Sequence, residues 1–149
     1  MEWIDIQYVR FIPESGDVGL LLLRIGFGLS LFLKHGLETL TKYSRMVVHF
    51  SDPIGISSHA SLAYALLTDG ICSLLVILGL GTRWAALLIS IFLTVALMFV
   101  HHMDFFGNGH VELVVAYTFA FLTLLISGPG RYSLDHCFNR VSDKETWVI

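Results

Sequence analysis

The chain has 149 residues, of which 55% are hydrophobic and only 14% charged, with a formal net charge of −3. Its mean hydropathy of +0.73 is far from that of a soluble domain, and it has no basic stripe that would suit nucleic acid. The two cysteines form no Cys-x-x-Cys motif, which excludes the chemistry of paired-thiol membrane enzymes. We therefore predict a protein whose main partner is the lipid bilayer.

Residues 1–17 hold four acidic residues against a single arginine, Arg10. A secretory signal peptide begins with a basic region, so this segment has the wrong polarity for one. Its many aliphatic and aromatic residues suit a membrane surface better than water. We expect residues 1–17 to form a retained cytoplasmic or interfacial segment before the first membrane helix.

Four apolar runs follow, each close to the length of about 20 residues that a helix needs to cross a bilayer. They are Val18–Leu37, Leu62–Leu80, Trp84–Val100 and Val111–Ser127. The predicted fold class is all-α integral membrane, with a bundle of four transmembrane helices in residues 18–130. Residues 131–149 then form a cytoplasmic tail, which could seat a partner protein or lie on the membrane as an amphipathic helix.

The first loop, Thr39–Ser61, is long for a connection between bundle helices, and long loops often carry structure or function of their own. Residues 43–50 contain an apolar pattern that could lie flat on the membrane, and Asp52-Pro53 then breaks the segment. We predict an interfacial segment in this loop that covers the outer end of the bundle. The alternative is that the cover acts as a lid on a site beneath it.

Charged residues within the apolar runs mark a first candidate site, because charge on a membrane helix usually faces the bundle interior. Arg24, His35 and Glu38 lie on one helical stripe. At a rise of about 1.5 Å per residue, Arg24 and Asp69 of the second helix come to similar depths. An unpaired charge there would cost several kcal/mol, so each of the two needs a partner, water or neutralisation. Their similar depth predicts that Arg24 and Asp69 can pair with each other. The pair either fixes the helix register or faces a ligand.

A second group of candidates is predicted at the outer rim of the bundle: His35, Glu38, His101 and Glu112. Histidine titrates near neutral pH, so such residues can move protons or contact the head group of a ligand. Zinc or iron is an alternative, with His35, His101, His102 and His110 as candidate ligands, although their spacing matches no known metal motif. A haem held by His35 and His101 is a further alternative.

The distribution of lysine and arginine sets the expected orientation. The termini and the second loop hold five of these residues, and the first loop region holds three, when the intramembrane Arg24 is left out. The third loop holds none. We therefore expect both termini to lie in the cytoplasm.

Several motifs carry a family resemblance. They are Arg24 with Gly28, His35-Gly36, the acid at 69, Leu78-Gly79-Leu80-Gly81-Thr82-Arg83, and Gly128-Pro129-Gly130-Arg131-Tyr132-Ser133-Leu134-Asp135. Over residues 18–135 the chain resembles the DoxX family of small membrane proteins. The family usually has Glu followed by a glycine pair in the second helix, where this chain has Asp69-Gly70-Ile71. The resemblance implies a four-helix bundle in the bacterial inner membrane with both termini cytoplasmic.

Two functions stay open at this point. The resemblance implies an accessory component of a membrane redox system, which would bind a lipophilic ligand such as a quinone between its helices. The alternative is a non-catalytic scaffold or partner-binding subunit, in which the polar residues only hold the bundle together. The number of histidines and carboxylates at the outer rim favours a site for a small ligand or ion.

Overall fold

The first helix is much longer than its apolar run. In the computed structural model, which describes residues 16–52, 55–100 and 111–138, this helix extends from Gly16 to Met46. It consists of α1 (Gly16–Leu31), the π-helical segment η2 (Phe32–Gly36) and α2 (Leu37–Met46). The backbone departs from helical geometry at Lys42 (φ −113°, ψ 15°), which marks a kink near the end of the helix.

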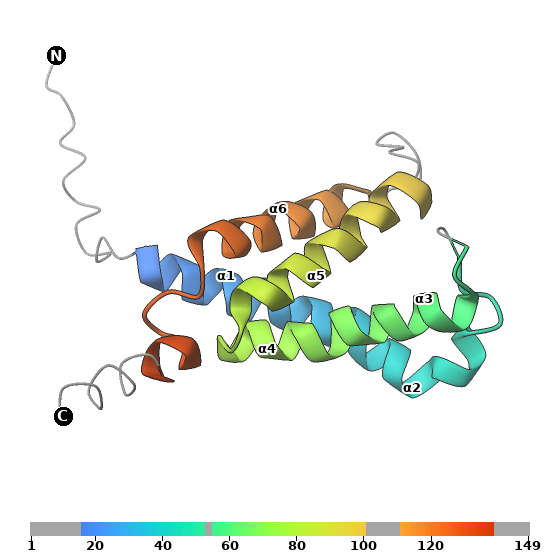
Figure 1. The fold of residues 1–149 in the computed structure, drawn as a ribbon, viewed down its shortest axis with the longest axis horizontal. Helices are drawn as coiled ribbons and strands as arrows, with labels where there is room; N and C mark the ends of the chain where they lie inside the picture. The colour runs from blue at the N-terminus through green and yellow to red at the C-terminus, as the bar shows by residue number, and fades with distance from the viewer. Residues whose placement is uncertain (1–15, 53–54, 101–110, 139–149) are drawn as a thin grey trace, which may run out of the picture.

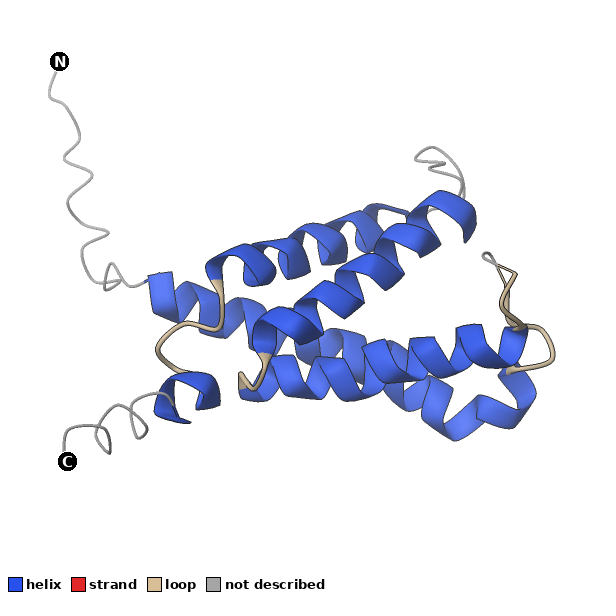
Figure 2. Ribbon diagram, viewed as in Figure 1, coloured by secondary structure: helices blue, strands red, loops and turns tan. Residues whose placement is uncertain are grey.

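Two further helices are long and apolar enough to cross a membrane. One combines α3 (Ser58–Ala65), η3 (Leu66–Cys72) and α4 (Ser73–Leu78), and the next combines α5 (Thr82–Val95) and η4 (Ala96–Val100). The apolar helix α6 (Val111–Ser127) is shorter, with 17 residues. The described residues contain helices and loops without strands (Figure 2). The all-α class is therefore confirmed, and three of the four predicted spans have the length to cross a bilayer.

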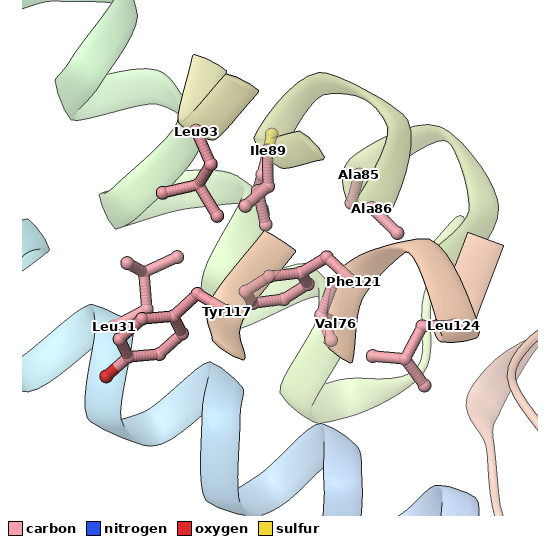
Figure 3. Packing of buried hydrophobic residues seen from close by; sticks show 10 residues of the cluster. Leu31, Val76, Ala85, Ala86, Ile89, Leu93, Tyr117, Phe121 and Leu124 are labelled. Atoms are coloured by element: carbon pink, nitrogen blue, oxygen red, sulfur yellow. The ribbon is translucent and has the colours of Figure 1, made fainter. Parts of the chain in front are cut away.

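The helices pack in a closed order. The helix α1 packs on α4, α4 contacts α5, α5 lies along α6, and α6 returns to α1 (Figure 1). Apolar side chains from all four helices meet in one core, which includes Leu31, Val76, Ile89 and Phe121 (Figure 3). Burying such side chains stabilises the contacts between helices, and Tyr117 adds a hydrogen bond to Ser30 (2.5 Å) within the same region.

The first loop is shorter than predicted, because the helices on both sides continue into the expected loop Thr39–Ser61. The connection covers residues 47–57, and α3 already begins at Ser58. The Ser57 side chain accepts a hydrogen bond from the Ala60 amide and so caps the start of α3. The interfacial segment that we predicted for residues 43–50 is therefore partly the end of α2.

Glycines set the register between the first two helices. An added Cβ at Gly36 would lie 2.4 Å from the carbonyl oxygen of Asp69, and one at Gly28 would lie 3.3 Å from the carbonyl oxygen of Ser73. The two backbones can approach this closely only where there is no side chain between them. The first helix therefore runs antiparallel to the second with Gly36 opposite Asp69.

We expect Gly36→Ala to lower the stability of the protein by about 1–3 kcal/mol, because the added methyl group must push apart two backbones. Gly26→Ala is the matched control, since a Cβ at position 26 meets nothing within 4 Å and alanine favours a helix by about 1 kcal/mol over glycine. Thermal unfolding in detergent measures both variants. Equal melting temperatures for the two would contradict the close approach at Gly36.

Candidate functional site

Arg24 is held at one end of the molecule by the segment that follows α6. Its side chain is buried, with 1% of the residue exposed. The guanidinium donates hydrogen bonds to the backbone carbonyl oxygens of Pro129 (2.8 Å) and Tyr132 (2.5 Å). Hydrogen bonds from an ionised donor are stronger than those between neutral groups. Arg24 therefore ties residues 129–132, more than 100 positions away in the sequence, to the first helix.

Asp135 extends this connection to the third helix. Its carboxylate accepts hydrogen bonds from the backbone amides of Gly81 (2.8 Å) and Thr82 (3.2 Å) at the start of α5, where free amides favour a negative charge. Its own amide donates to the carbonyl of Gly79 (2.9 Å). We call residues 128–138 the C-terminal hook. The hook joins α1, α4 and α5 at one end of the molecule (Figure 1).

Gly79 makes the junction possible. It has a left-handed backbone (φ 74°), and a Cβ at this position would clash with the Arg24 guanidinium and with Ser133. Only glycine fits both the backbone conformation and the space. Gly79 of the predicted motif around residues 78–83 is therefore explained by the packing of Arg24, whereas Gly81 is explained by its left-handed backbone (φ 54°) at the start of α5.

The predicted ion pair between Arg24 and Asp69 was wrong. Arg24 of α1 lies level with Gly79, which ends the second helix. Asp69 lies ten residues before Gly79 in that second helix, which places it about 15 Å from Gly79 along the helix axis. Within the described residues, the hydrogen-bond partner of the Asp69 side chain is the hydroxyl of Thr68 (3.2 Å). The error arose because the depth of each residue was counted from the start of its apolar run.

The other predicted site residues do not gather at one place in the described structure. Glu38 forms an ion pair with Lys42 (2.8 Å) on an exposed surface of α2, and Glu112 is exposed in the first turn of α6. His35 precedes Gly36 and so lies near the level of Asp69. The predictions for His101, His102 and His110 lie outside the described residues.

The predicted metal site finds no support in the described part of the chain. Among those residues, no group of three or more histidine, cysteine or carboxylate side chains is close enough to bind a metal ion. Three of the four candidate histidines lie outside the described ranges, so a metal site or haem that uses them stays a prediction. The ligand-handling roles of Arg24, His35, Glu38, Asp69, His101 and Glu112 likewise stay predictions.

A cavity of about 470 Å³ lies at the opposite end of the molecule from the hook. The helices α3 and α5 diverge towards this end (Figure 1), and the first loop contributes to the cavity wall. Its lining residues are His49, Phe50, Ser51, Ile56, Ser61, Tyr64, Ile91, Phe92, Val95, Ala96 and Val100. The size and the mostly apolar lining are typical of sites for small lipophilic ligands.

Two aromatic residues give the cavity a fixed wall. Tyr64 and Phe92 make an edge-to-face contact with ring centroids 5.7 Å apart. The Tyr64 hydroxyl donates to the carbonyl of Leu88 (3.2 Å), which holds the ring in place. Besides Tyr64, the polar residues of the lining are His49, Ser51 and Ser61. The cavity therefore offers an apolar wall with a small polar region beside it.

The sequence did not identify this cavity. Its lining comes from three separate segments, and most of those residues are ordinary apolar residues of membrane helices. The predicted cover over the outer end was the available signal, because residues 49–51 and Ile56 of the first loop do line the cavity.

Asp52 anchors the loop that forms part of the wall. Its carboxylate accepts hydrogen bonds from the amides of Ile56 (3.0 Å) and Ser57 (2.7 Å) and from the hydroxyl of Ser61 (3.2 Å). Desolvation alone would raise the pKa of Asp52, but the hydrogen bonds to its charged form outweigh it, so that its pKa lies below the ordinary value of 3.8.

Comparison with known proteins gives a family and a relative. The DoxX family model matches residues 19–102, which is more than half of the chain. An uncharacterized protein of Haemophilus influenzae is 29% identical to this chain over 116 residues, which cover 72% of the chain and 82% of the relative. No solved structure gives a significant match.

We expect Arg24→Met to lower the unfolding free energy by about 3 kcal/mol, because two partly buried hydrogen bonds from a charged donor, each worth about 1.5–3 kcal/mol, are lost. Arg24→Lys should fall in between, since one ammonium cannot reproduce the planar guanidinium. Arg131→Met is the control. Its ion pair with Asp17 (3.5 Å) is exposed, so its loss should change stability by less than about 1 kcal/mol. Equal melting temperatures of Arg24→Met and Arg131→Met in detergent would contradict a stabilising role of the hydrogen bonds from Arg24 to the hook.

The Asp52 loop should loosen in acid. A lowered pKa means that the hydrogen bonds of the carboxylate contribute stability at neutral pH, and that this contribution is lost as the pH falls through the folded-state value, below 3.8. Hydrogen exchange of the Ile56 and Ser57 amides should then accelerate relative to the intrinsic rate. Asp52→Asn should exchange faster already at neutral pH and lack this acid step. An unchanged acid step in Asp52→Asn would assign it to another group.

Proposed function

The chain belongs to the DoxX family, and on that premise we propose that it is an accessory component of a membrane redox system that binds a lipophilic ligand such as a quinone. We further propose a bundle of four transmembrane helices in the bacterial inner membrane with both termini in the cytoplasm. The cavity between α3, α5 and the first loop carries the functional proposal. The start of α1 and the hook lie at the same end of the molecule, which supports a common side for the termini (Figure 1).

The lining of the cavity matches the chemistry of a quinone. A quinone has a flat apolar ring with two carbonyl oxygens and a long apolar tail. The rings of Tyr64 and Phe92 provide a surface for the flat head. Ser51 belongs to the lining, and its hydroxyl can donate to a carbonyl oxygen, whereas the Ser61 hydroxyl already donates to Asp52. Apolar residues of α5 and η4, such as Ile91 and Val100, suit the tail.

The family supports a membrane location but no specific reaction. The matched relative is uncharacterized, so the redox role rests on the cavity and on the resemblance. The alternative is a scaffold without a small ligand. One observation favours it: Arg24, the buried cation predicted as a candidate ligand contact, is committed to carbonyls of the hook.

Photolabelling with an azidoquinone of the protein in nanodiscs separates the two functions. If the cavity binds quinones, labelled peptides should come from residues 49–64 and 91–100, and excess unlabelled quinone should suppress the labelling. Ala96→Phe places a ring in the cavity lining and should reduce labelling at least tenfold. Ala116→Phe is the matched control, because Ala116 is exposed on α6 outside the cavity and its replacement should leave labelling unchanged.

Two outcomes would overturn the quinone proposal. One is labelling that spreads along lipid-facing helices and resists competition. The other is equal labelling of Ala96→Phe and Ala116→Phe when both variants are folded. Native mass spectrometry of the wild-type protein from membranes adds an independent measurement, because a retained quinone would appear as a mass increment. An apo mass together with a bound protein partner would favour the scaffold.

A further inference from the structure

Asp69 is the one buried acidic side chain in the described part of the chain, with 6% of the residue exposed. It lies in η3, near the middle of the second apolar helix. The π-helical segment η2 of the first helix packs against η3, and Gly36 allows the two backbones to touch at this point. Neither the hook nor the cavity lining includes Asp69.

The groups around Asp69 include more hydrogen-bond acceptors than the Thr68 hydroxyl can satisfy with its one proton. The Thr68 hydroxyl lies within range of three acceptors: the carbonyls of Tyr64 and Ala65, both at 3.1 Å, and Asp69 Oδ1 at 3.2 Å. A hydroxyl has a single proton to donate, and threonine in a helix usually donates it to a carbonyl of the preceding turn. When it does so, the contact with Asp69 becomes a hydrogen bond only if the aspartic acid carries a proton and donates it.

No cation pairs with Asp69 within the described residues. The ion pairs found there are Glu38 with Lys42 and Asp17 with Arg131. The elements packed on η3 contribute Lys34 and His35 from η2, both exposed, while Cys72 lies on η3 itself. From α2 come Glu38, Lys42, Tyr43 and Arg45, and from α3 come His59 and Tyr64. On α5 the ionisable residue is Arg83, which lies at the hook end. A carboxylate without a cation is costly within a membrane.

We propose that Asp69 is a proton-binding site within the membrane. The carboxylate takes up one proton to give the neutral carboxylic acid, and it returns to the carboxylate when that proton leaves, with no other bond made or broken. The facing π-helical segments are consistent with this role, because such wide turns occur often at functional sites. This proposal does not depend on whether the cavity binds a ligand.

Labelling with dicyclohexylcarbodiimide tests the proposal on the full chain in nanodiscs. This apolar reagent adds a protonated carboxyl across its carbon–nitrogen double bond, and rearrangement gives a stable N-acylurea that mass spectrometry locates in the sequence. We expect labelling at Asp69 that decreases at least tenfold as the pH rises through the titration of the group. Glu38 and Asp52, which are partly exposed and have ionic or hydrogen-bonded partners, are internal controls and should stay unlabelled.

A second measurement does not depend on the reagent reaching its target. Infrared spectra contain a carbonyl stretching band for a protonated carboxyl that a carboxylate lacks. Asp69→Asn preserves the shape of the side chain and should remove both this band and the label. Two results would overturn the proposal: neither label nor protonated-carboxyl band at Asp69 in the folded wild-type protein, or labelling and a band that do not change with pH. Both are measured on wild type, so the test survives a variant that fails to fold.

Discussion

The hydrogen bonds of one buried guanidinium organise an entire end of this protein. Arg24 donates to two carbonyls of the C-terminal hook, and the position of the hook places Asp135 on the free amides of α5. Gly79 leaves room for both Arg24 and Ser133. The most specific residues of the DoxX resemblance thus meet in one structural junction. Their joint presence in the sequence is explained by packing, without assigning any of them to a reaction.

The two ends of the molecule have different physical characters. At the hook end, polar contacts connect segments that are distant in sequence. At the other end, α3 and α5 diverge around the cavity, and the loop there is held mainly by Asp52. The π-helical segments of the described residues, η2, η3 and η4, lie outside the hook contacts. A fixed end and an open end suit the proposed binding of a lipophilic ligand.

The sequence predicted the apolar helices well and their relative depth poorly. The run Val111–Ser127 matches α6, because its ends coincide with changes in polarity. The first helix continues nine residues beyond the expected Leu37, since the charged residues after it also favour helix. The relative depth of two residues on neighbouring helices depends on how the helices are aligned, which is set above all by the contact of Gly36 with the backbone of Asp69. A single sequence does not show this alignment. The cavity was missed for the same reason, because it forms where two helices diverge.

The π-helical segment η3 explains why an acid can be buried in the second helix. Thr68, Asp69 and Gly70 are buried in succession, whereas three consecutive residues of an α-helix span about 200° of its circumference at 3.6 residues per turn. A wider turn brings the three towards neighbouring helices, and Gly36 removes the side chain that would otherwise keep the first helix away. The same helix carries Ser61 and Tyr64 in the cavity wall. A change in the charge of Asp69 would therefore act on the helix that also shapes the cavity.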